Sequence, residues 1–257
     1  MDKVSVIVPV YQADKWIDHC LDSIKTQSYQ NVELIVIDDS QASGAAAARN
    51  RGLDKATGEY VMFVDADDYL REFAIEHMVE AMDGVEMVAG SFMKFGLFEE
   101  RVVHITQTMT MFDVAQYAMG NLLNPRKNQL LSGCWAKLYR RNMVKKFPDL
   151  TTAEDMAFNY DYLTRCDNAR FISNLVYNNR KRPGSLSTTY DKKNQHGLFG
   201  FIEGLEYVQN FLSSFYSESE INRAADMSKI YHSMLSFMRI CEQEGGSMRE
   251  VFRKLYP

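Results

Sequence analysis

The chain has few cysteines and no long hydrophobic run, and each shortage argues against a class of protein. The four cysteines, at positions 20, 134, 166 and 241, are widely spaced and form no CxxC pair, which argues against a disulfide framework or a zinc site. No apolar run approaches the ~20 residues that span a bilayer, and Asp2 and Lys3 lead directly into a short strand with no signal-peptide pattern. These absences predict a reduced, cytoplasmic protein.

Other absences limit the function and the domain count. No GxGxxG follows the first predicted strand, which argues against a dinucleotide oxidoreductase. No stretch rich in Pro, Gly or Ser divides the 257 residues, and a net charge of −5 argues against a surface that coats nucleic acid. The 46% hydrophobic content suffices for a full core. We therefore expect one large α/β domain, or one domain with a small appendage.

Strand and helix signals alternate along the first part of the chain, which predicts βαβ crossovers and a mainly parallel sheet. Strands are expected over 3–10, 32–37, 60–64, 85–89, 135–139 and 170–177, with a hairpin over 92–105. Helices are expected over 16–24, 45–55, 71–82, 111–123 and 154–163. From residue 196 onward the strand signals stop, and three helices are expected over 197–215, 221–241 and 247–255.

The most informative segment is YVMFVDADDYL, residues 60–70. Its apolar half reads as a strand covered on both faces, as in a parallel sheet. Asp65, Asp67 and Asp68 follow at the carboxyl end, where open α/β sheets bind ligands. Such carboxylates suit a hard divalent cation that also contacts phosphate. The alternative is an acidic loop in which Asp68 caps the following helix.

Acidic pairs recur at Asp38-Asp39 and Glu154-Asp155, so three acidic sites surround one predicted sheet. At this point the chain resembles a known family. The segments VSVIVPVY, VELIVIDDS and AAARNRGLDKATGEYVMFVDADDYL resemble the donor half of family-two glycosyltransferases with the GT-A fold. The segments GCWAKLYRRNMV, AEDMAFNYDYL and RKRPGSLST resemble that family's second half. The resemblance implies a GT-A-like catalytic domain over 1–195, split into halves at residue 90, and a helical extension over 196–257.

The resemblance implies roles for residues at the ends of the first two strands. Pro9, Val10 and Tyr11 would leave the first strand where such enzymes hold the nucleotide base. Asp39 would accept the uracil N3–H, which favours uridine nucleotides because a wrong base leaves both groups unpaired. Asp38 would contact the ribose or only shape the turn.

The basic residues have two interpretations each. Arg49, in AARN, lies where the family often carries a basic residue near the donor, and its alternative is a solvent-facing helix arginine. Lys137, Arg180 and Arg182 are candidate phosphate contacts, with solvated surface charge as the alternative.

Asp65 and Asp67 match the two ends of the family's DxD motif, with Ala66 between them at the donor. The resemblance implies that Asp67 holds Mn²⁺ or Mg²⁺ and that Asp65 contacts the ribose or completes the metal shell. Such an ion bridges the diphosphate and offsets charge on the departing nucleoside diphosphate. Asp68 is expected to cap a helix, and His196 is a weak candidate for a late metal ligand.

Asp155 matches the family's catalytic base, which takes the acceptor hydroxyl's proton in an inverting transfer. Glu154 would position the acceptor, or would only favour the helix N-terminus through the dipole. Trp135 would stack on a sugar ring, or would lie in the core as most tryptophans do.

The chain also departs from the family's pattern. Relatives usually continue from IDDS through a helix and a strand before the AARN segment, whereas here only a few residues separate Ser40 from Gly44. About one helix and one strand are therefore absent, either through a real deletion or because a stretch is missing from the given chain. A real deletion would remove a strand beside the base pocket. This shortening makes the roles of Asp39 and Arg49 less secure than those of Asp65 and Asp67.

Together these features predict an inverting, metal-dependent glycosyltransferase that uses a UDP-sugar and a glycan or lipid-linked acceptor in bacterial surface polysaccharide or glycoconjugate synthesis. Peripheral contact with the inner face of the membrane, and a homo-oligomer formed through the helical tail, are further expectations. One alternative is a sugar-phosphate nucleotidylyltransferase, although PVYQADKW is a poor match to the glycine-rich basic loop of such enzymes. Another is a scaffold of the same fold that binds nucleotide-sugar without turnover.

Overall fold

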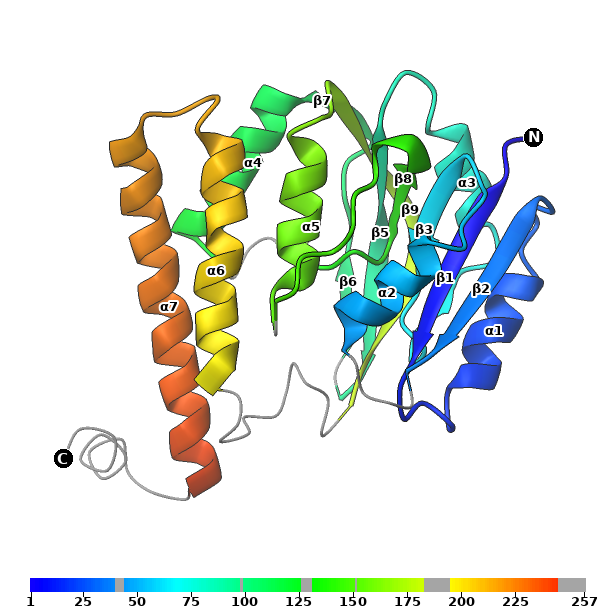
Figure 1. Ribbon diagram of the computed structural model, residues 1–257, viewed down its shortest axis with the longest axis horizontal. Helices are drawn as coiled ribbons and strands as arrows, with labels where there is room; N and C mark the ends of the chain where they lie inside the picture. Colours follow the sequence, from blue (N-terminus) through cyan, green and yellow to red (C-terminus); the bar gives the residue numbers. More distant parts are fainter. Residues whose placement is uncertain (40–43, 98, 126–130, 151, 183–194, 245–257) are drawn as a thin grey trace.

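A mixed β-sheet forms the centre of the computed structural model, and helices lie on both of its faces (Figure 1). The structure describes the chain except residues 40–43, 98, 126–130, 151, 183–194 and 245–257, and it describes the backbone alone at 195–199 and 237–244. The strands are β1 (Val4–Val10), β2 (Val32–Asp38), β3 (Tyr60–Phe63), β4 (Tyr69–Leu70), β5 (Met87–Gly96), β6 (Glu100–Val102), β7 (Gln107–Thr110), β8 (Lys137–Arg140) and β9 (Asn168–Lys181). The helices are α1 (Ile17–Lys25), α2 (Ala45–Leu53), α3 (Ala74–Glu80), α4 (Met111–Leu123), α5 (Glu154–Leu163), α6 (Gln195–Leu212) and α7 (Glu218–Glu244), with a 3-10 turn at Arg141–Met143.

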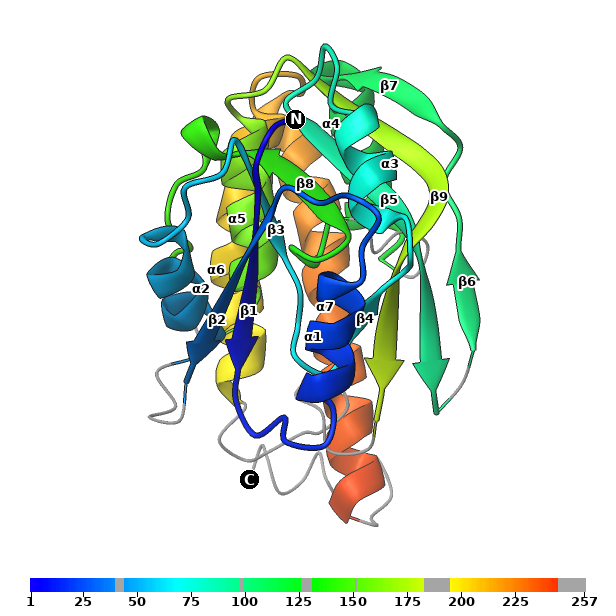
Figure 2. The same ribbon diagram turned by 90° about the vertical axis from the view of Figure 1, so that its right-hand side faces the viewer.

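The strand order is β2-β1-β3-β8-β5-β9-β4, with β6 beside β5 and β7 beside β9. β1 runs parallel to both β2 and β3, as expected for the first half of the chain. β8 enters between β3 and β5 antiparallel to both, so the second half is joined to the first within one sheet (Figure 2). The carboxyl ends of β1, β2 and β3 therefore meet at the same edge of the sheet.

β1 is apolar on both faces because both faces are covered. Val6 and Val8 are fully buried in the cluster that includes Cys20 and Ile24 of α1, whereas Ile7 is fully buried in the cluster on the opposite face. Gly52 of α2 lies so close to Ile7 that an added Cβ would clash with that side chain. The missing side chain lets α2 pack tightly against β1, and this packing fixes the position of the α2 residues near the sheet edge.

β2 is the first strand in the order and pairs only with β1 among the strands of the described chain. Val36 on β2 is 43% exposed, a high value for valine in a sheet. β2 ends at Asp38 and α2 begins at Ala45. This arrangement agrees with the expected loss of one helix and one strand after Ser40.

Two local expectations around β4 and β5 have different outcomes. The expected helix over 71–82 is shorter, Ala74–Glu80, and β4 precedes it. The residue before this helix is Phe73, so the expectation that Asp68 caps it is wrong. The hairpin expected over 92–105 is present, because Phe92 on β5 pairs antiparallel with Val102 on β6.

The C-terminal helices α6 and α7 pack against α4 and α5 (Figure 1). Leu205, Val208 and Phe211 of α6 are at most 2% exposed and belong to the same core as Ile7. The apolar face of α6 is therefore buried against the rest of the protein. The helix expected over 247–255 lies outside the described residues. Among the described helices, none combines the length and apolarity needed to cross a membrane.

Candidate active site

The acidic loop that follows β3 is held by β9. Asp65 donates its backbone N–H to the Tyr177 hydroxyl over 3.1 Å. The buried Asp68 carboxylate accepts hydrogen bonds from Asn179 Nδ2 at 2.8 Å and from the Arg180 backbone N–H at 2.6 Å. Asp68 thus connects the acidic loop to β9 through these hydrogen bonds, and it does not cap a helix. Its bonds fix the loop that presents Asp65 and Asp67.

Asp67 lies beside two arginines from the end of β9. Arg182 Nε donates to Asp67 Oδ2 over 2.8 Å, and Arg180 Nε donates to the Asp67 carbonyl over 2.9 Å. The Arg180 guanidinium also lies 4.0 Å from the ring centroid of Trp16 and 4.5 Å from that of Phe95, which holds it by cation–π contacts. Both arginines that the sequence marks as phosphate contacts therefore lie at the acidic loop.

Glu154 and Asp155 begin α5, directly after Ala153, whose φ of 62° turns the chain into the helix. Their side chains are 18% and 16% exposed. Burial, and next the charge of Asp155, raise the pKa of Glu154 to about 7, although the Arg49 guanidinium opposes this rise. Two adjacent carboxylates thus lie in a poorly hydrated place, and Glu154 takes up a proton at a higher pH than an exposed glutamate does.

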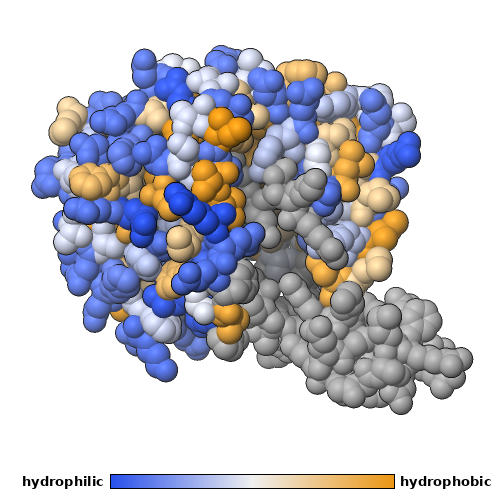
Figure 3. Space-filling model, turned by 180° about the vertical axis from the view of Figure 1, so that it is seen from behind, coloured by the Kyte–Doolittle hydropathy of each residue, from blue (hydrophilic) through white to orange (hydrophobic). Residues whose placement is uncertain are grey.

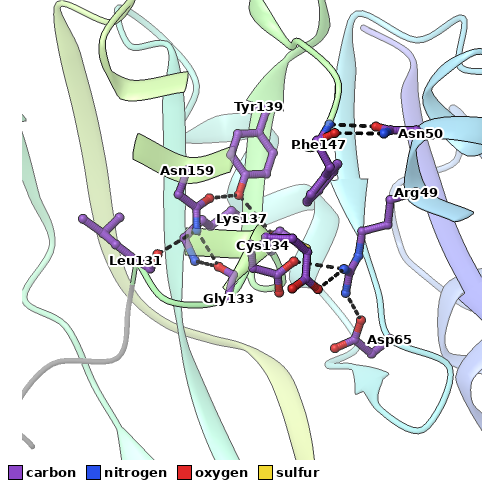
Figure 4. Close-up of polar contacts among 12 residues, drawn as sticks. Arg49, Asn50, Asp65, Leu131, Gly133, Cys134, Lys137, Tyr139, Phe147 and Asn159 are labelled. Atoms are coloured by element: carbon purple, nitrogen blue, oxygen red, sulfur yellow. Dashed lines mark hydrogen bonds and ion pairs between the residues drawn. The ribbon is translucent and has the colours of Figure 1, made fainter. Parts of the chain in front are cut away.

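Arg49 connects the two acidic sites. It lies on α2, is 4% exposed, and places Nη2 2.9 Å from Asp65 Oδ1. Its Nη1 lies 2.9 Å from Asp155 Oδ1 and 3.2 Å from Glu154 Oε1. Figure 4 shows the guanidinium reaching from α2 to Asp65. The solvent-facing alternative for Arg49 is therefore wrong, and this one side chain brings the loop after β3 together with the start of α5.

The loop before β8, which carries Gly133 and Cys134, is fixed by buried polar side chains (Figure 4). Lys137, which is 1% exposed, donates to the Gly133 carbonyl at 2.5 Å and to the Trp135 carbonyl at 3.3 Å. Burial lowers the pKa of Lys137 to about 8. Neither a phosphate contact nor a surface charge describes this lysine, because its ammonium group is used inside the protein.

Asn159 and Tyr139 complete this network. Asn159 Nδ2 donates to the Leu131 carbonyl at 2.8 Å and to the Gly133 carbonyl at 3.0 Å, and its Oδ1 accepts from the Tyr139 hydroxyl at 2.6 Å. The same loop carries Cys134, a fully buried residue near Asp155, and burial raises the pKa of its thiol. The sequence pattern does not predict this network. The only sign of it in the sequence is a set of polar residues within otherwise apolar segments.

Trp135 is half-buried and belongs to the core side of this loop. Its ring stacks on that of Tyr177 at 5.2 Å between centroids and meets Phe92 edge-on at 4.6 Å. The core alternative for Trp135 thus describes its contacts. Stacking on an acceptor sugar stays a prediction.

Asp39 lies at the carboxyl end of β2, where its backbone N–H donates to the Val10 carbonyl over 2.8 Å. The side chain is 4% exposed, accepts from the Gly44 N–H at 3.1 Å, and pairs with Arg51 at 2.8 Å. This buried acceptor stands beside the end of β1, as a base contact requires. Its contact with uracil stays a prediction.

The remaining predicted donor residues have varied surroundings. Tyr11 is 49% exposed, just beyond the half-buried Pro9 and Val10, and Asp38 is exposed at the end of β2. Ala66 is buried between the two acids of the DxD pattern. His196 lies in the first turn of α6, and its side chain is outside the described part of the chain.

The donor set fits a hard divalent cation in its chemistry. Asp65 and Asp67 offer carboxylate oxygens on one short loop, and Mg²⁺ and similar ions commonly take one or two carboxylates together with substrate phosphates. Among the described residues, no group of three or more His, Cys, Asp or Glu side chains is arranged so that it could hold a metal ion. Both carboxylates already contact arginine, so a metal at Asp67 would compete with Arg182.

Comparison with known proteins identifies the family. The family model described as glycosyl transferase family 2 matches two pieces of the chain, residues 5–45 and 40–147. The two pieces overlap at the segment after Ser40, where this chain has fewer residues than the family's usual pattern. The glycosyltransferase GlyA of Streptococcus pneumoniae is 27% identical over 231 residues, which cover 77% of this chain and 33% of GlyA. EpsH of Bacillus subtilis is 25% identical over 292 residues, covering 98% of this chain and 80% of EpsH. That alignment is longer than the 257-residue chain, so EpsH carries internal residues that this chain lacks.

Solved structures show the same fold. A crystal structure of Staphylococcus aureus TarS, residues 1–349, in complex with UDP-GlcNAc aligns with a TM-score of 0.66 and 22% identity, covering 88% of this chain and 71% of TarS. The sheet and its helices are therefore GT-A-like. This chain spans about a third of GlyA, whose length extends well beyond the match. The family match covers more than half of the chain and contains Arg49, Asp65 and Asp67, so this chain belongs to glycosyl transferase family 2.

Proposed function

We propose that the protein transfers a sugar from a UDP-sugar to a hydroxyl group of a glycan or lipid-linked acceptor, with inversion at the anomeric carbon. One observation carries this proposal: Asp65 of the DxD loop and Asp155 of α5 contact the same buried guanidinium. A site for the donor diphosphate and a carboxylate able to accept a proton therefore face one another. The complex of TarS with UDP-GlcNAc supports a uridine donor.

The donor half would be held by residues at the carboxyl ends of β1, β2 and β3. Asp39, a buried acceptor beside Val10, would receive the uracil N3–H. Arg180 and Arg182 lie at the acidic loop and would place positive charge near the diphosphate. Asp67, with Asp65 beside it, would hold Mn²⁺ or Mg²⁺, which when bound offsets charge on the departing UDP.

Asp155 would act as the base. The acceptor oxygen forms a bond to the anomeric carbon as the bond from that carbon to the UDP phosphate oxygen breaks, and UDP leaves with the electron pair. The proton of the acceptor hydroxyl passes to the Asp155 carboxylate. The ion pair with Arg49, whose Nη1 lies 2.9 Å from Asp155 Oδ1, fixes this carboxylate. Fixed geometry of this kind is a large part of catalysis by a general base.

The bacterial origin of GlyA, EpsH and TarS supports a role in building surface polysaccharide or glycoconjugate. The acceptor itself would lie on the side of α5, near Glu154 and the loop that carries Trp135. A cytoplasmic location at the inner face of the membrane is part of the same proposal.

The test is a screen of UDP-sugars for UDP release with Mn²⁺ or Mg²⁺, with EDTA as the metal-free arm. Asp155→Asn should cut turnover by ~10²–10⁴-fold, the usual contribution of a general base, while UDP binding by calorimetry stays near the wild-type value. Full turnover in Asp155→Asn would show that the base is another group. UDP binding without turnover of any donor would support the non-catalytic scaffold.

A further inference from the structure

We propose that Arg49 is a positioning residue for the transfer reaction: it fixes the Asp155 carboxylate relative to Asp65, and so holds the base in register with the donor. This inference rests on the proposed function, in which Asp155 is the base. It gives Arg49 a role other than donor binding.

The contacts of Arg49 leave little of its guanidinium for a ligand. Nη2 is used by Asp65 at 2.9 Å, and Nη1 is shared by Asp155 at 2.9 Å and Glu154 at 3.2 Å. Arg49 is also 4% exposed. A phosphate could reach the Arg49 guanidinium only by displacing a carboxylate. The observed geometry instead places the guanidinium between the carboxylates and holds them apart.

The surroundings prevent Arg49 from moving away. The neighbouring residue, Asn50, exchanges two hydrogen bonds with the Phe147 backbone: Nδ2 donates to the carbonyl at 3.0 Å and Oδ1 accepts from the N–H at 2.7 Å. The Phe147 ring lies 5.5 Å from the guanidinium carbon. α2 itself is seated on β1 through Gly52 and Ile7. The Arg49 guanidinium is thus carried by a firmly packed helix, with an aromatic ring beside it.

Charge explains why a cation is needed here. Asp65, Glu154 and Asp155 approach one another from two elements, and all three are largely buried. Without a positive charge between them, like charges in a poorly hydrated place repel and turn away or take up protons. A lysine would supply the charge but only as a point, because it lacks the planar fork that contacts carboxylates on two sides. Both the charge and the shape of Arg49 are therefore used.

The decisive experiment is a double-mutant cycle. Arg49→Lys and Arg49→Met are each made alone and together with Asp155→Asn, and UDP release from the best UDP-sugar of the screen is measured. A misplacement of about 1 Å costs about 10²-fold in rate, so we expect kcat to fall by about this factor in each single Arg49 variant. In the Asp155→Asn background the further loss should be much smaller, because a residue that acts through Asp155 has nothing left to position.

Calorimetry with UDP and Mn²⁺ provides the readout that does not depend on turnover. The Kd for UDP should stay near the wild-type value in both Arg49 variants. The matched control is Arg165→Met, which removes an arginine that pairs with Asp161 at the opposite end of α5 from Glu154 and should lower the melting temperature while kcat stays near wild type. If Arg49→Met does not fold, Arg49→Lys carries the test.

Three results would overturn the inference. Unchanged kcat in a folded Arg49 variant would show that no positioning is needed. A Kd for UDP that rises as much as kcat falls would make Arg49 a donor ligand. An equal loss in both backgrounds would show that Arg49 acts independently of Asp155. Full activity of Asp155→Asn alone would instead refute the assignment of the base, and so the two failures are distinguishable.

Discussion

Replacing Asp68 by asparagine tests how the acidic loop is held in place. The Asp68 carboxylate accepts from the Arg180 N–H at Oδ1 and from Asn179 Nδ2 at Oδ2, so both of its oxygens face donors. An asparagine has the same shape but presents an NH₂ group on one side, which faces a donor and leaves it unpaired. One buried donor without a partner costs about 1–3 kcal/mol.

The expected loss can be expressed as a melting temperature. For a chain of this size, 1 kcal/mol corresponds to about 2–4 °C, so a loss of about 2 kcal/mol lowers the melting temperature by about 4–8 °C. Asp68→Ala should cost more, because every donor then loses its acceptor. Asp83→Asn is the matched control, since Asp83 is exposed in the turn after α3.

Thermal unfolding followed by calorimetry is the assay, with UDP and Mn²⁺ titrations at a temperature where every variant is folded. Because Asp68 holds the loop that carries Asp67, Asp68→Asn should also weaken metal-dependent UDP binding, whereas Asp83→Asn should change neither property. Identical melting temperatures for the two asparagine variants would refute the view that Asp68 is a strut between the loop and β9.

Three other predictions concern the donor and the two acids of α5. Asp67→Ala should keep the fold but lose metal-dependent binding of UDP, and calorimetry in which Mn²⁺ strengthens UDP binding as in the wild type would contradict the metal role. UDP should bind more tightly than GDP because the buried Asp39 acceptor suits the uracil N3–H; equal affinities would remove that role. Burial raises the pKa of Glu154 from 4.5 to about 7, so the folded state binds the extra proton and stability falls as pH rises through this window. Glu154→Gln should therefore weaken the fall in melting temperature between pH 5 and pH 8, and an unchanged pH dependence would show that Glu154 titrates normally.

The sequence predicts the acidic loop and α5 because their signals are local. Tyr60–Phe63 is an apolar run that ends in acids, and 154–163 has helical spacing after an acidic pair. Such patterns depend on neighbours within a few residues, and the structure places both elements within a residue of their expected bounds. Similarly, the few residues between Ser40 and Gly44 were enough to predict an incomplete sheet edge at β2.

The sequence does not predict the burial of Arg49, because its helix carries no apolar stripe that would mark an inner face. Its partner Glu154 lies 105 positions away along the chain. The sequence does not predict the burial of Lys137 either. In a four-residue strand, the residue pattern does not distinguish a lysine that bonds to carbonyls of its own loop from a solvated one. Asp68 has a plausible local role as a cap, but its partner Asn179, 111 positions away, forms the bond instead. Arg49 and Asp68 are thus placed by distant elements, whereas Lys137 is placed by its own loop.

These separations also set an order of events during synthesis. A ribosome releases the chain from its N-terminus, and domains commonly begin to fold as they emerge. The strands β1, β2 and β3 and the helix α2 are complete once Phe63 has been made, and Asp65 follows at once. Glu154 and Asp155 arrive much later, so the nascent nucleotide half carries Arg49 with a single carboxylate beside it. Asp155, the proposed base, therefore reaches its place after Asp65, and a chain that stalls before α5 lacks both this carboxylate and the β9 residues that hold the acidic loop.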